Sequence, residues 1–453
     1  MNERNYVIDV DYSEKVGPVK RMNAVNNGPL MVGKEQKRSN YDTFKAAKFP
    51  YVRNHDASIC YNFGGEHTVD VHAIFPDFDK DVNDPASYDF FYTDKYLAHI
   101  LSTGSKIVYR LGTKIEHGEK RYATIPPKDF NKWAEICEHI VMHYLDGWAD
   151  GFHWDIEYWE IWNEPDGNPN WTGTPEQYYD LYRITATRLK ERFPNIKIGT
   201  AFAYPIGTAF VHRAAGDFKI GFFEMLKKEN GRVPLDFHGF HGYIFYPEAI
   251  SRLANAEYEL LKEYGYENIE LFISEYNYAV ENGGMHEKFV ESVKGIIGIE
   301  GATFTASAMC EGQNSPLDML MYYDAQPSCF NGIFDFYTLE VLKGYYPFVM
   351  LAHLRDLGMQ VKSTIEGNDK TKPISTIFAT GDDGEAAMIS YFAGEVLVDA
   401  NVKIKISNSK NTRFSLYMLD REHNMEKTAE LDFVNGEVEI VMPPMSVAFL
   451  KAE

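Results

Sequence analysis

Hydrophobic and polar positions follow one repeating unit between about residues 19 and 358. Each unit is a short apolar run, then a polar loop, then a longer amphipathic stretch. Short apolar runs between turn residues predict buried strands, and amphipathic stretches predict helices. The predicted strands span residues 20–26, 51–55, 106–112, 158–164, 197–204, 235–243, 271–277 and 303–311.

Helices are predicted between these strands, for example at residues 93–104, 175–193 and 340–358. The second of them follows Thr174, a favourable N-cap residue, and begins with Pro175. Eight strands that alternate with helices predict a (β/α)8 barrel of the TIM type. The rival, a doubly wound nucleotide-binding sheet, would need a G-x-G-x-x-G or P-loop turn, and the sequence contains neither.

After Gly358 the apolar residues recur with period two, and the runs break at Gly, Asn and Asp. Short alternating strands of this kind predict an antiparallel β-sandwich of about a hundred residues. The run N-Y-V-I-D-V-D at residues 5–11 alternates in the same way. We therefore predict a barrel domain at 17–359 and a β-sandwich accessory domain at 360–453, completed by an N-terminal strand within 1–16.

Composition narrows the set of partners. The formal net charge of the 453 residues is -21, which argues against binding to nucleic acid or to an anionic membrane surface. No stretch approaches 18 uninterrupted apolar residues, and the N-terminus lacks the pattern of a secretory signal. The four cysteines form no C-x-x-C motif and are expected to be reduced, as in a cytoplasmic protein. The sequence leaves a homo-oligomer open.

Acidic residues stand at the ends of two predicted strands. The fourth strand ends at Asn163 and Glu164, just before Pro165, and the seventh strand contains Glu275 near its end. Because the chemistry of such barrels lies at the carboxyl ends of the strands, the two glutamates could face each other across the mouth. Paired carboxylates serve glycoside hydrolysis, with retention at a separation of roughly 5–5.5 Å and inversion at ~6.5–9.5 Å.

Other strand ends supply polar candidates. Arg53 and His55 share one face of the second strand, and a guanidinium there would keep a nearby carboxylate ionised. His241 and Tyr243 share a face of the sixth strand, and Glu311 ends the predicted eighth strand. Taken singly, each is also compatible with an ordinary turn or with core packing. The run H-T-V-D-V-H at 67–72 lacks a third ligand at a familiar spacing, so no metal or other cofactor is predicted.

The runs W-E-I-W-N-E-P-D (159–166) and F-I-S-E-Y-N (272–277) together resemble glycoside hydrolase family 39, whose members are retaining glycosidases with (β/α)8 barrels. Further agreement comes from residues 88–97, from H-G-Y at 241–243 and from the C-terminal run at 442–450. The resemblance implies that Glu164 is the general acid/base and Glu275 the nucleophile. It also implies substrate-binding or orienting roles for Asn163, His241, Tyr243, Arg53, His55 and Trp162.

The resemblance further implies an exo-acting enzyme that releases sugars from a small carbohydrate substrate, above all a β-xylosidase. Other glycones stay open, namely a β-glucoside, a β-galactoside, an α-L-arabinoside or an α-L-iduronide. Residues 55–72, just after the second strand, depart from the β-xylosidase pattern, which bears on the sugar that is bound. The alternative from another class is a catalytically silent sugar-binding protein.

Overall fold

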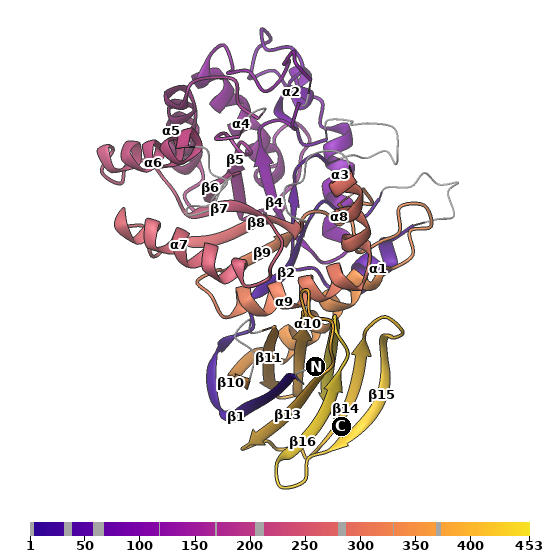
Figure 1. Cartoon of the computed structure of the whole chain (residues 1–453). Helices are drawn as coiled ribbons and strands as arrows, with labels where there is room; N and C mark the ends of the chain where they lie inside the picture. Colours follow the sequence, from indigo (N-terminus) through magenta and orange to yellow (C-terminus); the bar gives the residue numbers. More distant parts are fainter. Residues whose placement is uncertain are drawn as a thin grey trace.

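A closed barrel of eight parallel strands forms the larger part of the chain (Figure 1). The computed structural model describes residues 4–30, 39–57, 68–116, 118–167, 170–203, 213–279, 287–328, 330–367 and 373–453. The barrel strands are β2 (Arg21–Asn26), β3 (Tyr51–Asn54), β4 (Lys106–Leu111), β5 (Tyr158–Ile161), β6 (Lys197–Phe202), β7 (Phe237–Ile244), β8 (Glu270–Tyr278) and β9 (Met319–Tyr322). Neighbours in the barrel are neighbours in the sequence, and β9 closes the ring on β2.

Helices follow the strands and cover the outside of the barrel (Figure 1). The α5 helix shows how local sequence sets a boundary, because Thr174 and Gln177 form a capping box around Pro175. The helical elements are α1 (Tyr41–Ala46), α2 (Val71–Ile74), η1 (Pro85–Ser87), α3 (Phe91–Ser102), α4 (Phe130–Leu145), α5 (Pro175–Arg192), α6 (Arg213–Lys228), α7 (Ala249–Glu263), α8 (Glu287–Ile297), α9 (Ile299–Gln313), η2 (Lys343–Tyr345) and α10 (Tyr346–Leu357).

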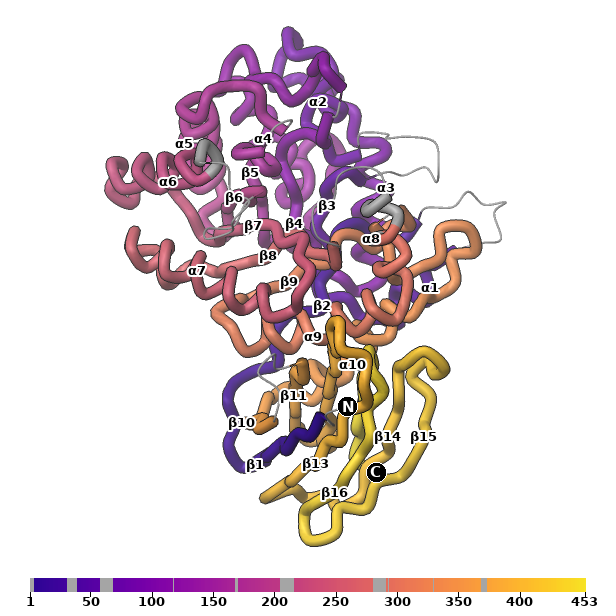
Figure 2. Tube along the Cα trace, viewed as in Figure 1, coloured from indigo at the N-terminus to yellow at the C-terminus, as the bar shows by residue number. Residues whose placement is uncertain are grey.

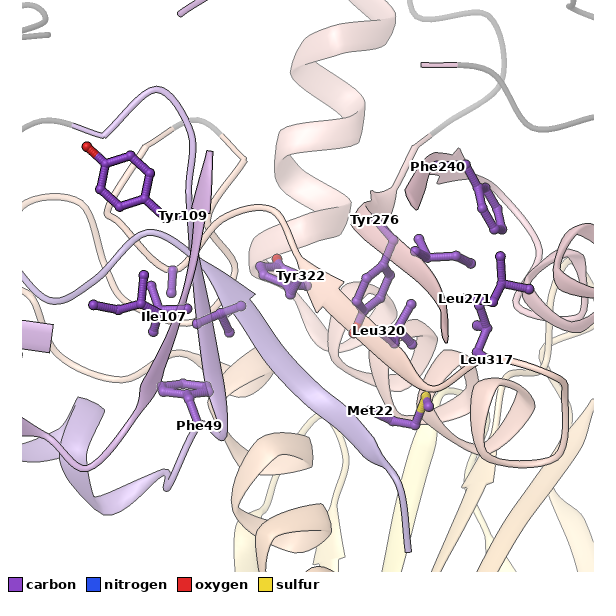
Figure 3. Close-up of a cluster of buried hydrophobic side chains, with 14 of the residues drawn as sticks. Met22, Phe49, Ile107, Tyr109, Phe240, Leu271, Tyr276, Leu317, Leu320 and Tyr322 are labelled. Atoms are coloured by element: carbon purple, nitrogen blue, oxygen red, sulfur yellow. The ribbon is translucent and has the colours of Figure 1, made fainter. Parts of the chain in front are cut away.

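Apolar side chains fill both sides of the barrel wall. Inside, a separate cluster includes Val108, Tyr158, Phe237 and Phe272, and the Tyr158 ring packs edge-on against both phenylalanines. Outside, strands and helices share a larger cluster, part of which Figure 3 shows. The lower barrel is therefore a packed core, which leaves chemistry to the carboxyl ends of the strands.

The second domain is a nine-stranded, mostly antiparallel sheet below the barrel (Figure 1). Strand β1 lies inside this sheet, antiparallel to β10 and parallel to β13. One apolar cluster contains side chains from both edge strands of this sheet, such as Leu431 and Ile440. The strands are β1 (Arg4–Pro18), β10 (Met359–Gly367), β11 (Ile374–Gly381), β12 (Gly384–Tyr391), β13 (Ala400–Ser407), β14 (Arg413–Leu419), β15 (Asn424–Asp432), β16 (Glu437–Met442) and β17 (Ser446–Ala452). The predicted fold class is confirmed.

Helices α9 and α10 lie between the barrel and the sheet, as the backbone trace shows (Figure 2). Ser307 on α9 donates to Ser390 on β12 over 2.8 Å, and the Ser390 hydroxyl donates to the carbonyl of Thr303. The Gln313 amide donates to the side-chain oxygen of Gln360 on β10 over 2.7 Å. Buried polar bonds with satisfied partners thus join the two domains.

The predicted eighth strand is wrong. Residues 303–311 lie within helix α9, and the strand that closes the barrel is β9, a run of four residues. Residues 301–310 are all buried, so this helix has no exposed polar face. The sequence therefore lacks the 3.6-residue alternation of polar and apolar positions that predicts a helix. The helix predicted at 340–358 begins only at Tyr346, after the short turn η2.

The structure bears on the predictions about membrane-spanning segments and about the cysteines. Among the described residues, no helix combines the length and the apolarity needed to cross a membrane. Cys137 and Cys310 are buried free thiols, whereas Cys60 and Cys329 lie outside the described residues.

Candidate active site

Glu164 reaches the barrel mouth through a strained turn. Strand β5 stops at Ile161, and both Trp162 and Glu164 then adopt positive φ angles, 68° and 46°. Such conformations cost of order 1–3 kcal/mol each and persist only where the surroundings hold them. Here the amide of Glu164 donates to the carbonyl of Ala201 on β6 over 2.9 Å. Pro165 follows and prevents the strand from resuming, so the carboxylate stands at the rim.

Glu275 lies on the inner face of β8 because of a β-bulge. The pairing of β7 with β8 shifts by one residue, so that Phe240 pairs with Ile273 but His241 pairs with Glu275. The extra residue is Ser274. A bulge redirects the side chains that follow it. It brings the His241 ring and the Glu275 carboxylate side by side at the mouth.

The two glutamates flank one imidazole nitrogen. Nδ1 of His241 lies 2.5 Å from Oε1 of Glu164 and 3.5 Å from Oε2 of Glu275. One oxygen of each carboxylate and this nitrogen all lie within 4.8 Å of one another. Retaining glycosidases hold their two carboxyl groups roughly 5–5.5 Å apart and inverting ones ~6.5–9.5 Å apart, so facing oxygens within 4.8 Å of each other are nearer to the retaining arrangement.

Two donors hold the carboxylate of Glu275. Arg53 donates to Oε1 over 2.7 Å, and the hydroxyl of Tyr243 donates to Oε2 over 2.8 Å. Burial raises the pKa of Glu275, while the nearby His241 and the Arg53 guanidinium oppose that rise. The group is buried, yet its negative form is the one that the donors favour.

Arg53 joins four elements from the centre of the mouth. Its fully buried guanidinium makes a short bond of 2.6 Å to Glu160 on β5 and donates to Asn26 on β2. It also donates to Oδ1 of Asn163 over 2.6 Å. The amide nitrogen of Asn163 is thereby turned away from the arginine, and it has no partner within the described part of the chain.

The surroundings of Glu164 differ from those of Glu275. Its side chain is 16% exposed, against 5% for Glu275. Asn170 donates its side-chain amide to Oε2 of Glu164. Burial lowers the pKa of His241 to about 4, so the ring is neutral at pH 7. The ring nitrogen and Oε1 of Glu164 form a hydrogen bond of 2.5 Å, whose donor is set by the tautomer of the ring.

Two residues predicted at the site lie elsewhere. Trp162 is buried in the barrel wall, where its ring packs near Trp133 and Trp171 and its Nε1 donates to the carbonyl of Asn170. The positive φ at Trp162 breaks the strand alternation that would have pointed the ring inward.

Glu311 is the second correction. It sits on α9, where it accepts hydrogen bonds from Ser251 and from Ser375 of the sheet domain. Glu311 and Ser375 line both of two cavities, of about 670 and about 520 Å³, beside the sheet domain. The misplaced strand explains this error.

The remaining predicted residues gather at the mouth, with one addition. His55 is buried on the β3 side, and its ring centre lies 6.5 Å from that of Tyr323. Tyr323 follows β9, the true last strand of the barrel, and its ring centre lies 6.4 Å from that of Tyr243. The sequence reasoning missed Tyr323 and Asn170. The apolar run M-L-M-Y at 319–322 was the available signal for the first, whereas nothing in the sequence distinguishes Asn170.

Within the described residues, the only cluster with metal-binding geometry is Glu164, His241 and Glu275. Each carboxylate there already accepts hydrogen bonds from protein donors, namely Asn170, Tyr243 and Arg53. Acid–base chemistry uses the same three side chains without a metal.

Paired carboxylates at the ends of β5 and β8 of an eight-stranded barrel suit a glycosidase. Residues 34–279, more than half of the chain, match the sequence model described as Glycosyl hydrolases family 39. The chain belongs to this family. The resemblance found in its sequence is therefore confirmed at the level of the family.

Individual relatives are distant. A β-xylosidase of Geobacillus stearothermophilus is 28% identical over 149 residues, which cover 32% of this chain and 25% of that protein. The structure of a glucosidase from Croceicoccus marinus has a TM-score of 0.78 at 21% identity, over 100% of this chain and 99% of that one. A monomeric β-xylosidase from Caulobacter crescentus CB15 has a TM-score of 0.68 at 16% identity, over 99% of each chain. The two structures bear on the fold alone.

Proposed function

We propose that the family 39 enzyme is a retaining exo-β-xylosidase, with Glu164 as general acid/base and Glu275 as nucleophile. The observation that carries this proposal is the separation of the two carboxylates, whose facing oxygens lie within 4.8 Å. A direct attack of the carboxylate on the anomeric carbon fits this distance, and a water molecule held between a general-base carboxylate and the anomeric carbon does not.

In the first step, a carboxylate oxygen of Glu275 forms a bond to the anomeric carbon as the bond to the leaving oxygen breaks. Glu164 gives its proton to that leaving oxygen, so the aglycone departs as a neutral alcohol and a glycosyl ester remains. Arg53 and Tyr243 hold the nucleophile in place and balance its charge before the attack.

In the second step, Glu164 is a carboxylate and accepts a proton from water. The water oxygen bonds to the anomeric carbon, and the ester bond to Glu275 breaks, which restores both side chains and the original configuration. His241 contacts both acids and keeps Glu164 directed at this point in each step. The buried amide nitrogen of Asn163 is placed to donate to the sugar 2-hydroxyl.

Sequence similarity to a protein named β-xylosidase supports the choice of xylose, together with the runs at 159–166 and 272–277. A panel of 4-nitrophenyl glycosides tests it. We expect the β-xyloside to be the best substrate in kcat/KM, ahead of the β-glucoside, β-galactoside and α-L-arabinoside. A different leading glycone would overturn the choice of sugar and leave the two catalytic roles standing.

The two roles have separate tests. Glu275→Gln should abolish nearly all turnover of the aryl xyloside. Glu164→Ala should retain activity on substrates with good leaving groups, and azide should then restore the rate by attacking the glycosyl-enzyme and give a β-xylosyl azide. Glu270→Gln, at the start of β8 and at the opposite end of the barrel, is the matched control.

A 2-deoxy-2-fluoro xyloside with a good leaving group should add its sugar mass to the peptide that contains Glu275. Normal activity of Glu275→Gln on every aryl glycoside would show that the assignment is wrong. Calorimetric binding of xylose by a protein that hydrolyses no glycoside would instead identify a sugar-binding protein.

A further inference from the structure

A second buried ion pair stands at the barrel mouth, at the end of β4. Nη2 of Arg110 lies 2.6 Å from Oδ1 of Asp70, and both side chains are almost fully buried. Asp70 occupies the N-cap position of α2 but makes no capping bond. Aspartate is favoured there because it caps backbone amides. This aspartate is instead directed at Arg110.

The backbone fixes Asp70 at this place. Val71 donates its amide to the carbonyl of Gly112, just past the end of β4, over 2.9 Å. Val69 has a φ of 68°, which is rare for a β-branched residue, and its amide donates to Thr93 on α3. A strained residue that the surroundings hold in place is typical of functional sites.

Arg110 faces the inside of the barrel. It pairs along the sheet with Glu160, whose carboxylate binds Arg53, and Arg53 in turn binds Glu275. Two residues earlier on the same face of β4, Val108 belongs to the cluster that fills the barrel interior. The ion pair is therefore on the same inner surface as the two glutamates.

Several buried polar atoms here have no hydrogen-bond partner in the part of the chain that the structure describes. They are Nε and Nη1 of Arg110 and both ring nitrogens of His55. Arg110 is 0% exposed and His55 is 1% exposed. Because buried polar groups are nearly always hydrogen-bonded, four such atoms next to a catalytic pair indicate a place where a ligand supplies the partners.

We propose that Arg110 and Asp70, together with His55, form the wall of the glycone subsite, which binds the hydroxyls of a neutral sugar and rejects a uronate. This inference rests on the proposed function. The arginine donates, and the imidazole both donates and accepts, which matches hydroxyl groups. Asp70, the residue that pairs with Arg110, lies between strands β3 and β4, directly before helix α2.

Charge balance excludes the acidic sugar. Arg110 and Lys114 are matched by Asp70 and Asp56, and all four interact with one another or with His55. Oδ2 of Asp56 lies 3.8 Å from Nε2 of His55. The carboxylate of a uronate would enter a place whose positive charge is already neutralised, and it would face two carboxylates.

The test measures how strongly glucose and glucuronate inhibit the hydrolysis of an aryl xyloside. The two sugars differ only at C6, where glucuronate has a carboxylate in place of the hydroxymethyl group of glucose. In the wild-type enzyme, glucose should inhibit more strongly than glucuronate. Asp70→Asn leaves the charge of Arg110 unbalanced. Inhibition by glucose should therefore become weaker and inhibition by glucuronate stronger, and the ratio of the two inhibition constants should shift by roughly tenfold or more. Glu270→Gln removes a carboxylate from the Arg21 pair at the other end of the barrel and should leave the ratio unchanged.

Glucuronate inhibition as strong as that by glucose in the wild-type enzyme would overturn the inference. So would an unchanged ratio in a folded Asp70→Asn variant. The wild-type comparison needs no variant, so it stands even where Asp70→Asn does not fold. If the protein hydrolyses no glycoside, the proposed function fails, yet calorimetric titration of the same two sugars still decides the inference.

Discussion

The hydroxyl of Tyr243 donates a hydrogen bond to Oε2 of Glu275 over 2.8 Å. The bond crosses from β7 to β8 at the mouth of the barrel. Burial raises the pKa of Glu275, and this bond is one of the contacts that lower it. Burial, together with Glu275, also raises the pKa of Tyr243 well above its ordinary range, so the tyrosine remains a donor at every pH at which an enzyme is assayed.

Tyr243→Phe should therefore move the acid limb of the kcat/KM profile to higher pH. Without the donor, the ionised form of Glu275 loses stabilisation, its pKa rises, and the fraction of active nucleophile falls at low pH. A hydrogen bond to a charged group contributes about 1.5–3 kcal/mol, so kcat/KM near neutral pH should fall by roughly tenfold or more. The measurement is kcat/KM for an aryl xyloside across the pH range.

Tyr246→Phe is the matched control, because Tyr246 lies three residues further along the chain, beyond the end of β7 at Ile244. Its pH profile should coincide with that of the wild-type enzyme. An acid limb that Tyr243→Phe leaves in place would show that this limb does not report Glu275.

Asn170→Ala should impair the enzyme most with poor leaving groups. Asn170 donates to Oε2 of Glu164, so its loss frees the acid to turn away from the leaving oxygen. Protonation matters more as the leaving group becomes more basic. We expect little change for a dinitrophenyl xyloside and a loss of roughly tenfold or more for xylobiose, since general acid catalysis contributes typically 10²–10⁴-fold.

The measurement for Asn170→Ala is a series of kcat/KM values over aryl xylosides of decreasing leaving-group acidity. Asn401→Ala is the control, because Asn401 is an exposed asparagine on β13, in the other domain, and its side chain donates to Asn5. A uniform loss across the series would mean that Asn170 supports the fold of the loop and does not orient the acid.

The sequence predicted the barrel well where each strand has polar neighbours. The run Y-W-E-I at 158–161 is followed by a proline and has loops on both sides, so its end could be located. Around the last strand this contrast is missing. The residues of α9 are buried throughout, and the true strand β9 has only four residues, so a long apolar helix was taken for the strand.

The candidate site divides in the same way. Glu164 and Glu275 could be found because strand ends place them, and Arg53, His241 and Tyr243 follow from alternation. Trp162 failed because alternation stops where φ becomes positive.

Asn170 and Asp70 come from loops, six residues after Glu164 and fourteen after Asp56 in the chain. Their positions depend on tertiary contacts that no periodic pattern records. Residues of this kind can be found only from the structure.

Removal of metal ions should leave the rate unchanged. The three atoms of Glu164, His241 and Glu275 that could hold a cation are the ones that the proposed reaction uses. EDTA should therefore not alter kcat/KM, and added Zn²⁺ should inhibit in competition with the substrate. A rate that falls after chelation and returns with a divalent cation would mean that the cluster is a metal site.

Glu257→Gln should destabilise the fold without touching the catalytic pair. Oε1 of Glu257 lies 2.7 Å from Nζ of Lys219, and Oε2 lies 2.8 Å from Nε2 of His238; all three side chains are buried. Burial alone would raise the pKa of Glu257, but the lysine and the histidine outweigh it and lower the pKa to about 2. Breaking a buried pair leaves an unpaired charge and costs about 3–5 kcal/mol, which urea unfolding at pH 7 can measure.

The stabilising contribution of Glu257 depends on pH. The ordinary pKa of 4.5 applies to Glu257 in the unfolded chain, which therefore binds more protons than the folded chain between about pH 2 and 4.5. The contribution of Glu257 to stability is complete above pH 4.5 and disappears as the pH falls toward 2. Glu257→Gln should thus lower the free energy of unfolding less at pH 3 than at pH 7.

The control is Glu259→Gln, on the same helix in an exposed pair with Lys262. It should change the free energy of unfolding by about 1 kcal/mol or less at both pH values. Equal losses for the two variants would show that the buried group does not stabilise the fold.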